Sequence, residues 1–287
     1  MINTQNLTWL LQLSRPRFWV YLFGPFIVGV AAGYNTNAGQ LEYIPLLFLA
    51  AVFFTFPANL IIYGVNDLYD YETDKHNVKK QSYETLLRPK YRPLFVRLMA
   101  LVTVPFIALL TAQLTLYGLT LGYVMLLGFL FFGIGYSAPP IRAKTKPFLD
   151  ALFNVLYVFP GLFGYVVLAG ELPPVSAMIA ATAWVVAMHA FSAVPDIKAD
   201  KKAQLRTIAT VLGRENTIVL CACLYAFSAS LVFQYITWMA IVGGVLYWAL
   251  MVLAYRAKTD KELFAVYKRF PVVNMVFGAV LFFIALL

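Results

Sequence analysis

The chain alternates between long apolar stretches and charged connections, and this alternation constrains the fold more than any other feature. Each stretch approaches or reaches the roughly 20 residues that a helix needs to cross the hydrocarbon core of a bilayer. Strands of a membrane barrel would be shorter and would alternate strictly between apolar and polar residues, which these stretches do not do. We therefore predict nine membrane-spanning helices, at residues 17–33, 43–65, 93–112, 116–136, 148–169, 174–195, 215–232, 235–255 and 270–287.

The composition supports a chain that lies almost entirely in the membrane. Hydrophobic residues make up 62% of the sequence and charged residues only 12%, whereas a soluble domain is nearer half apolar and a quarter charged. These values exclude a cytosolic enzyme, a disordered chain and a nucleic-acid-binding module. We predict an all-α integral membrane protein in which residues 1–287 form a single polytopic domain. Cys221 and Cys223 are interpreted as packing residues.

The positive charges are segregated with respect to the predicted spans. All 22 Lys and Arg residues lie in the N-terminal segment or in and beside the connections after spans two, four, six and eight. Positively charged loops remain in the cytosol, so we predict a cytosolic N-terminus and a C-terminus on the opposite side. Among the acidic residues, only Glu42 and Glu171 belong to the opposite face. Any chemistry is therefore expected at the cytosolic mouth of the bundle.

The second span ends in the acidic sequence NDLYDYETD. If the helix continues through it, Asp67 and Asp74 differ in direction by only about 20°. The other polar residues of the region fall in the same arc, so a polar stripe runs from inside the membrane to the cytosolic interface. Besides the two aspartates, this stripe contains Asn59, Tyr63, Asn66 and Asp70.

The sixth span ends in a second acidic sequence, DIKAD. Asp196 and Asp200 are four residues apart on one helix face, and His189 lies on that face one heptad earlier. Carboxylate oxygens at this spacing suit Mg²⁺, which binds through a few carboxylates together with substrate phosphates. Solvated loop acids are the alternative interpretation, but two acidic motifs on one membrane face favour a site for metal ions and a diphosphate. Massed carboxylates near a membrane are also costly without a neutralising cation.

These motifs resemble those of a known family. NDLYDYETD fits the NDxxDxxxD signature of the UbiA superfamily of intramembrane prenyltransferases, and DIKAD fits its DxxxD signature. The sequence YSAPPIRAK, from Tyr136 to Lys144, is similar to the family's signature after the fourth span. The resemblance covers essentially the whole chain. It implies a UbiA-like bundle of nine helices in which Mg²⁺ assists ionisation of a prenyl diphosphate and the prenyl group passes to a lipophilic acceptor in the membrane.

The candidate residues fit these roles. The expected metal ligands are Asn66, Asp67, Asp70 and Asp74 for one Mg²⁺, and Asp196 and Asp200 for the other. The five aspartates and Lys144 are the expected catalytic residues. The expected substrate-binding residues are Asn59, Tyr63, Asn66, Tyr136, Arg142, His189 and Lys201.

Several of these assignments have a simpler alternative. Arg142 and Lys144 follow a Pro-Pro turn that forbids a regular helix, where they could contact phosphate or serve only as positive-inside charges. Lys201 is open to the same two interpretations, as are Arg15 and Arg17. His189 could act as a base or be held by an ordinary hydrogen bond within the bundle.

The acceptor is the least constrained part of the prediction. The sequences around both acidic motifs look most like the lycopene elongase branch, which adds C5 units to carotenoids, although a Pro typical of related branches is replaced by Val78. An aromatic quinone precursor or a glycerol lipid is the alternative acceptor. A secondary transporter is the main alternative from another class, but transporter sites usually lie near the midplane of the membrane.

Overall fold

The computed structural model of the protein describes residues 4–36, 41–75 and 85–287. These residues form helices and connecting turns and contain no strand, so the predicted all-α class is confirmed. Nine helical segments within the described ranges are long and apolar enough to cross a bilayer, in the order that the sequence predicts. They are Pro16–Thr36, Ile44–Tyr69, Pro89–Leu116, Thr120–Ser137, Leu149–Ala169, Val175–Ala193, Ile208–Val232, Thr237–Arg256 and Asp260–Leu286.

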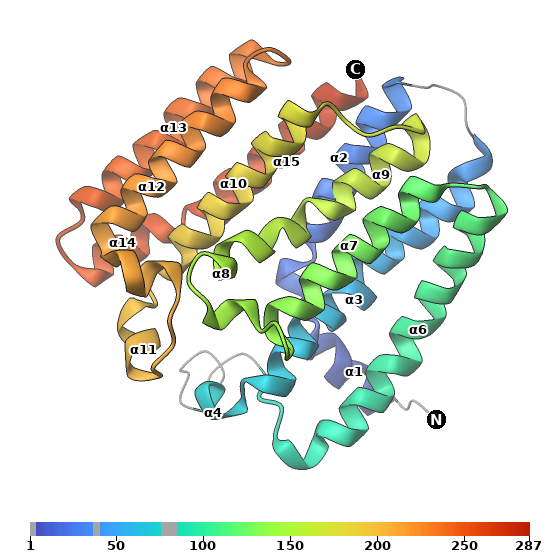
Figure 1. Ribbon diagram of the computed structural model, residues 1–287, viewed down its shortest axis with the longest axis horizontal. Coiled ribbons are helices and arrows are strands. Elements are labelled where there is room, and N and C mark those ends of the chain that lie inside the picture. Colours follow the sequence, from blue (N-terminus) through green and yellow to red (C-terminus); the bar gives the residue numbers. More distant parts are fainter. Residues whose placement is uncertain (1–3, 37–40, 76–84) are drawn as a thin grey trace. The chain divides into compact units, whose positions relative to one another are not determined.

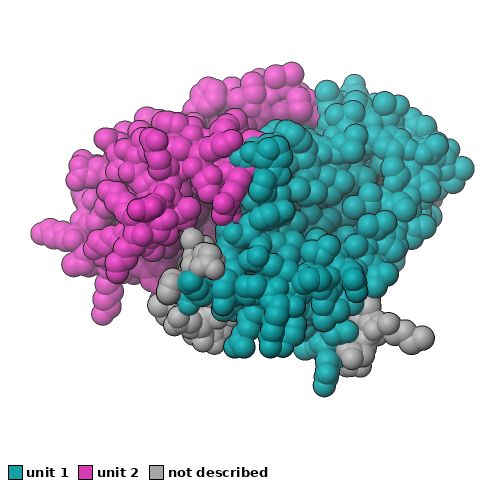
Figure 2. All heavy atoms as spheres, turned by 60° about the horizontal axis from the view of Figure 1, so that its bottom comes forward, with its two compact units in different colours: residues 1–141, 159–172, 284–287 teal, residues 142–158, 173–283 magenta. Residues whose placement is uncertain are grey.

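The chain divides into two compact units, which are coloured separately in Figure 2. Unit 1 comprises residues 1–141, 159–172 and 284–287, and unit 2 comprises residues 142–158 and 173–283. The first acidic motif belongs to unit 1 and the second to unit 2. That one polytopic domain spans the whole chain stays a prediction.

Unit 1 is built around two closely packed helix pairs, α2 with α9 and α3 with α6 (Figure 1). Its helices are α1 (Thr4–Leu13), α2 (Val20–Thr36), α3 (Ile44–Tyr69), α4 (Tyr71–Asp74), α6 (Arg92–Leu116), α7 (Thr120–Ser137) and α9 (Phe159–Ala169), with short 3-10 segments at η1 (Pro16–Phe18), η2 (Leu41–Tyr43) and η3 (Pro89–Tyr91).

Glycine allows α2 and α9 to approach backbone to backbone. A Cβ added at Gly29 of α2 would lie 1.9 Å from the carbonyl oxygen of Gly161, and one at Gly164 would lie 2.7 Å from the carbonyl oxygen of Phe26. Small residues serve this purpose between helices in membranes, where packing replaces the hydrophobic effect as the source of association. The close packing of α2 against α9 therefore holds α2, the helix that follows the N-terminal segment, in position.

The central helix α3 carries the first acidic motif at its end. Its buried face includes Phe53 and Phe54, and Phe54 makes an edge-to-face contact with Phe129 of α7 at 5.4 Å between ring centroids. On another side, Leu10 and Leu13 of α1 pack with apolar residues of α3 and α6. Helices on several sides therefore pack against α3, which ends in the first acidic motif.

Unit 2 packs α10 against α12 and α12 against α13. Its core contains the stacked rings of Tyr225 and Tyr247, with centroids 4.8 Å apart, and Phe270 beside them. The elements are η4 (Ala143–Thr145), α8 (Leu149–Leu152), η5 (Phe153–Tyr157), α10 (Val175–Ala193), α11 (Ile197–Lys202), α12 (Ile208–Val232), α13 (Thr237–Arg256), α14 (Asp260–Tyr267) and α15 (Phe270–Leu286).

Two spans are less regular than the sequence predicts. The fifth is composed of α8, η5 and α9, and Pro160, which lacks a backbone N–H, stands at the start of α9. The seventh begins earlier than residue 215, but it is interrupted at Gly213, which has a φ of 77°. Glycine adopts this left-handed conformation without a steric penalty. The short helices α1, α11 and α14 were not among the predicted elements.

Candidate active site

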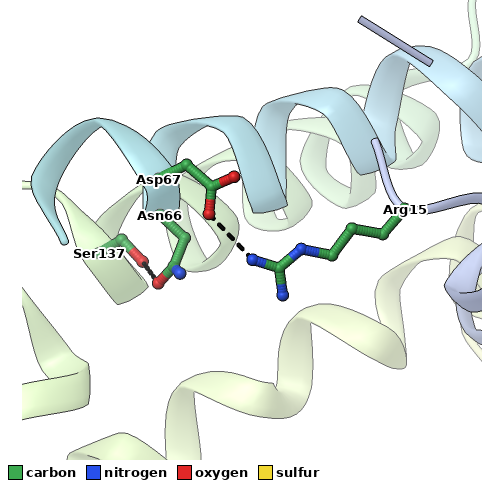
Figure 3. Close-up of polar contacts among 4 residues, drawn as sticks. All are labelled: Arg15, Asn66, Asp67 and Ser137. Atoms are coloured by element: carbon green, nitrogen blue, oxygen red, sulfur yellow. Dashed lines mark hydrogen bonds and ion pairs between the residues drawn. The ribbon is translucent and has the colours of Figure 1, made fainter. Parts of the chain in front are cut away.

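The end of α3 holds a buried ion pair. The guanidinium of Arg15 donates from Nη2 to Oδ1 of Asp67 at 2.9 Å, and the side chains of the two residues are 15% and 1% exposed. Figure 3 shows Arg15 reaching from the N-terminal segment to the carboxylate of Asp67. Because a buried carboxylate is strongly disfavoured without a partner, this arginine explains how a charged aspartate is accommodated here.

The backbone around Arg15 directs its side chain toward α3. Arg15 has a left-handed conformation, with a φ of 52°, and Pro16 begins η1 immediately after it. The guanidinium lies over the ring of Tyr63 at 4.8 Å, and this ring is 5.5 Å from that of Phe18. Cations are attracted to the face of an aromatic ring. Tyr63 therefore supports Arg15 from within the predicted polar stripe.

Asn66 is oriented by a second neighbouring helix. Its Oδ1 accepts a hydrogen bond from Oγ of Ser137 at 2.9 Å, and Ser137 is fully buried as the last residue of α7. Figure 3 shows the two adjacent residues Asn66 and Asp67 with their partners. The sequence analysis did not select Ser137, although it lies inside the YSAPPIRAK signature.

Asn59 lies two turns earlier in α3 and is fully buried. Its Nδ2 donates within its own helix, to the carbonyl oxygens of Phe54 and Thr55. Its Oδ1 is buried and accepts no hydrogen bond from the described residues.

The polar stripe does not follow one continuous helix. Helix α3 ends at Tyr69, and Asp70 caps it with φ and ψ of −109° and 9° before α4 begins. The amide of Asp74 nevertheless donates to the carbonyl oxygen of Asp70 at 2.8 Å, which keeps the two aspartates one turn apart. Both side chains are half-buried. Residues 76–84, with Val78 and Glu84, lie outside the described residues.

In unit 2, the second motif forms a short helix after α10. Asp196 caps α11 and is exposed, whereas Asp200 is half-buried, and the amide of Asp200 donates to the carbonyl oxygen of Asp196 at 2.9 Å. Burial, together with the negative charges of Asp196 and Asp150, raises the pKa of Asp200 to about 6. The hydroxyl of Thr207 donates to Oδ2 of Asp200 at 3.4 Å and opposes this rise.

Asp150 connects the second motif to the core of unit 2. It is 1% exposed, and its Oδ2 accepts the backbone N–H of Ile208, the first residue of α12, at 2.8 Å. Thr207 caps the same helix and shares a reciprocal capping arrangement with Thr210. The sequence analysis did not select Asp150, although an acidic residue inside a predicted span is itself an indication of function.

The remaining candidate residues are distributed over both units. Tyr136 is a half-buried residue of α7 in unit 1. In unit 2, Arg142 has a left-handed conformation, with a φ of 44°, and is followed in η4 by the half-buried Lys144. His189 is half-buried in α10, whereas Lys201 is exposed at the end of α11.

The donor set of the motifs fits a hard divalent cation. It consists of carboxylate and carboxamide oxygens, which Mg²⁺ prefers. The pKa of Asp200 is raised first by burial and then by the charge of Asp196, and a cation would offset both effects. Among the described residues, no three His, Cys, Asp or Glu side chains form a ready cluster for a metal ion.

The described residues thus contain nine helical segments able to cross a bilayer, and an acidic motif follows two of them. Comparison with known sequences assigns the family: the pattern of the UbiA prenyltransferase family matches residues 19–265. The chain belongs to this family and is a prenyltransferase, which confirms the resemblance seen in the motifs.

Two relatives and one solved structure illustrate the similarity. The chain is 40% identical over 282 residues to a lycopene elongase/hydratase of Haloarcula japonica, covering 98% of this chain and 92% of the relative. It is 32% identical to a C(50) beta-cyclic carotenoids biosynthesis protein of Dietzia sp., covering 95% and 63%. A UbiA homologue of Archaeoglobus fulgidus, solved with DMAPP and Mg²⁺, superimposes with a TM-score of 0.69 at 24% identity, covering 96% and 98%.

Proposed function

We propose that the protein transfers C5 prenyl groups from a prenyl diphosphate to the ends of lycopene, in a reaction that depends on Mg²⁺. The observation that carries this proposal is the 40% identity to a lycopene elongase/hydratase along nearly the whole of both chains. Identity that extends beyond the acidic motifs includes the apolar spans, which are the part of the protein that an apolar acceptor would contact.

The acidic motifs are proposed to hold Mg²⁺ and the diphosphate. Asn66, Asp70 and Asp74 would bind one ion, and Asp196 and Asp200 the other, on the cytosolic side of the membrane. Mg²⁺ bound there would neutralise charge on the departing diphosphate as a Lewis acid. The UbiA homologue solved with DMAPP and Mg²⁺ supports this assignment. The sequence analysis also placed Asp67 among the ligands, and its ion pair with Arg15 is considered below.

Cationic and aromatic side chains are proposed to assist the same step. Lys144 and Arg142 follow the Pro-Pro turn and would contact phosphate oxygens, Arg142 through two of its N–H groups. The exposed position of Lys201 suits a solvated charge or a peripheral phosphate contact. Tyr136 would present its ring toward positive charge on the prenyl group, which aromatic faces stabilise, and Tyr63, whose ring lies under Arg15, would line the site beside it. Asn59 and His189 would line the cavity.

The proposed transfer exchanges one carbon–oxygen bond for one carbon–carbon bond. The C1–O bond of the prenyl diphosphate breaks and its electron pair leaves with the diphosphate. The terminal double bond of lycopene then supplies the electrons for the new bond to C1. The cation that results on the acceptor loses a proton or is captured by water. An apolar polyene would be held by burial along a groove open to lipid, because the predicted spans carry Lys or Arg only within their first five residues, at Arg17 and Arg97.

We also propose that the N-terminus and the four positively charged loops are cytosolic and that the C-terminus lies on the opposite side. The proposal is supported by the placement of all 22 Lys and Arg residues beside alternate connections. With nine spans, the two termini must lie on opposite sides of the membrane.

Product analysis tests the proposed reaction. The purified protein is incubated with Mg²⁺, dimethylallyl diphosphate and either lycopene or a panel of aromatic and glycerol-lipid acceptors. We expect carotenoids extended by one or two C5 units, and none with Asp196→Asn. If lycopene is recovered unchanged while another acceptor is prenylated, the acceptor is wrong and prenyl transfer stands. A protein that prenylates no acceptor in any arm would contradict the proposed reaction as a whole.

A further inference from the structure

We infer that Asp67 is a positioning residue that acts through Arg15 and is not a ligand of Mg²⁺. The inference rests on the proposed function, because it assigns metal binding to some residues of the first acidic motif and the positioning of Arg15 to another. Asn66, Asp70 and Asp74 would serve the metal ion. Asp67 would instead hold the N-terminal corner of unit 1, where α1 meets η1, against the end of α3.

The ion pair places a positive charge directly on one carboxylate oxygen of Asp67. Oδ1 of this buried carboxylate lies 2.9 Å from Nη2 of Arg15, and the pair is largely removed from water. A divalent cation on the same carboxylate would stand beside the guanidinium in a region where like charges repel more strongly than in water. Breaking the pair would leave an arginine that is only 15% exposed without its carboxylate.

Arg15 is held for this contact by its surroundings. Its left-handed backbone, with a φ of 52°, and the following Pro16 fix the direction in which the chain leaves α1. Its guanidinium also lies over Tyr63, which precedes Asp67 by one helical turn. Figure 3 shows the side chain extended from this corner to Asp67. Asp67 and Tyr63 of α3 therefore both contact the guanidinium of Arg15, which belongs to the N-terminal segment between α1 and η1.

The neighbouring motif residues point elsewhere. Adjacent side chains on a helix differ in direction by about 100°, and Asn66 accepts a hydrogen bond from Ser137 of α7, whereas Asp67 pairs with Arg15. Asp70 and Asp74 follow Asn66 at intervals of four residues and are half-buried at the end of the helix. Asp67 therefore differs from Asn66 in its partner, and it differs from Asp70 and Asp74 in lying within α3, which ends at Tyr69.

The division of work has a kinetic consequence. Asp67 keeps a cation next to the motif, where the diphosphate of the substrate would bind. Loss of either partner is therefore expected to weaken binding of the prenyl diphosphate, whereas it leaves the metal ligands in place. A residue that acts through another has little further effect once the other is gone.

A double-mutant cycle tests the inference, with Asp67→Asn, Arg15→Gln and both together in the full-length protein, and Asp70→Asn as the control. Binding of Mn²⁺ without substrate is measured from the electron paramagnetic resonance signal of the free ion, and KM for the prenyl diphosphate is measured separately. We expect each single variant to raise KM at least about tenfold, the double variant to be no worse than Arg15→Gln, and Mn²⁺ affinity to stay within about threefold of wild type. In Asp70→Asn, Mn²⁺ affinity should fall more than about tenfold.

Two results would overturn the inference: a loss of Mn²⁺ affinity in Asp67→Asn equal to that in Asp70→Asn, or effects of Arg15→Gln and Asp67→Asn that multiply. If Asp67→Asn does not fold, the Arg15→Gln variant alone tests the inference. A wild-type KM in Arg15→Gln contradicts the inference, whereas a raised KM with retained Mn²⁺ affinity supports it. Full Mn²⁺ binding and activity in Asp70→Asn would instead refute the metal site of the proposed function. In that case, the Tm values of the wild type, the two single variants at Arg15 and Asp67 and the double variant would still show whether these two residues are energetically coupled.

Discussion

Replacing Asp150 should separate an anchoring role from an electrostatic one. Its Oδ2 accepts the N–H of Ile208 at 2.8 Å, and its negative charge raises the pKa of Asp200. Asp150→Ala removes both the acceptor and the charge. Asp150→Asn removes the charge but keeps an oxygen of the same size in the same place, so it is the matched control.

The expected loss of stability follows from the buried hydrogen bond. A hydrogen bond to a charged group contributes about 1.5–3 kcal/mol, and a buried N–H left without an acceptor costs about 1–3 kcal/mol. Removing the buried charge offsets part of this loss. We expect Asp150→Ala to reduce the free energy of unfolding by about 2 kcal/mol, or about 3 °C in Tm for a chain of this size. Asp150→Asn should lose less than about 1 kcal/mol, because the amide oxygen still accepts the N–H of Ile208.

The electrostatic effect should appear in both variants. Metal binding requires a deprotonated carboxylate, so Mn²⁺ affinity of the wild type should fall as the pH drops below about 6, the pKa of Asp200. Without the charge of Asp150, the pKa of Asp200 is lower, and the fall in affinity should move to lower pH. The assays are thermal unfolding followed by tryptophan fluorescence in detergent and Mn²⁺ binding between pH 5 and 8. Equal destabilisation by Asn and Ala, or an unshifted pH profile in both, would refute the reasoning.

Three further predictions concern the site and the topology. Asp196→Asn should reduce turnover at least about 100-fold, or about 2.7 kcal/mol of transition-state stabilisation, at an unchanged protein level in the membrane; near-normal turnover would remove Asp196 from the mechanism. Chelation of divalent ions should abolish prenyl transfer and added Mg²⁺ should restore it, whereas full activity in a metal-free preparation would contradict the metal assignment. Reporters inserted after Ala203 and at the C-terminus should lie on opposite sides of the membrane, and the proposed orientation fails if both are cytosolic.

The fold class and the family could be read from local features of the chain. Apolar length alone decides which segments can cross a bilayer, because the membrane imposes helices of nearly fixed length. The nine predicted spans were therefore confirmed in number and order. The acidic motifs are equally local, since their residues are separated by only a few positions, and the match to the UbiA prenyltransferase family confirms the resemblance based on them.

Contacts between residues far apart in the chain could not be read in this way. Helical periodicity places Asp67 and Asn66 on one polar arc, but it does not indicate that one meets Arg15, 52 residues earlier, and the other Ser137, 71 residues later. The same holds for Asp150, whose carboxylate is buried because the start of α12 provides a backbone donor. A pattern records the direction of a side chain on its own helix. Only the packing of helices determines which partner it finds and whether its charge is shielded from water.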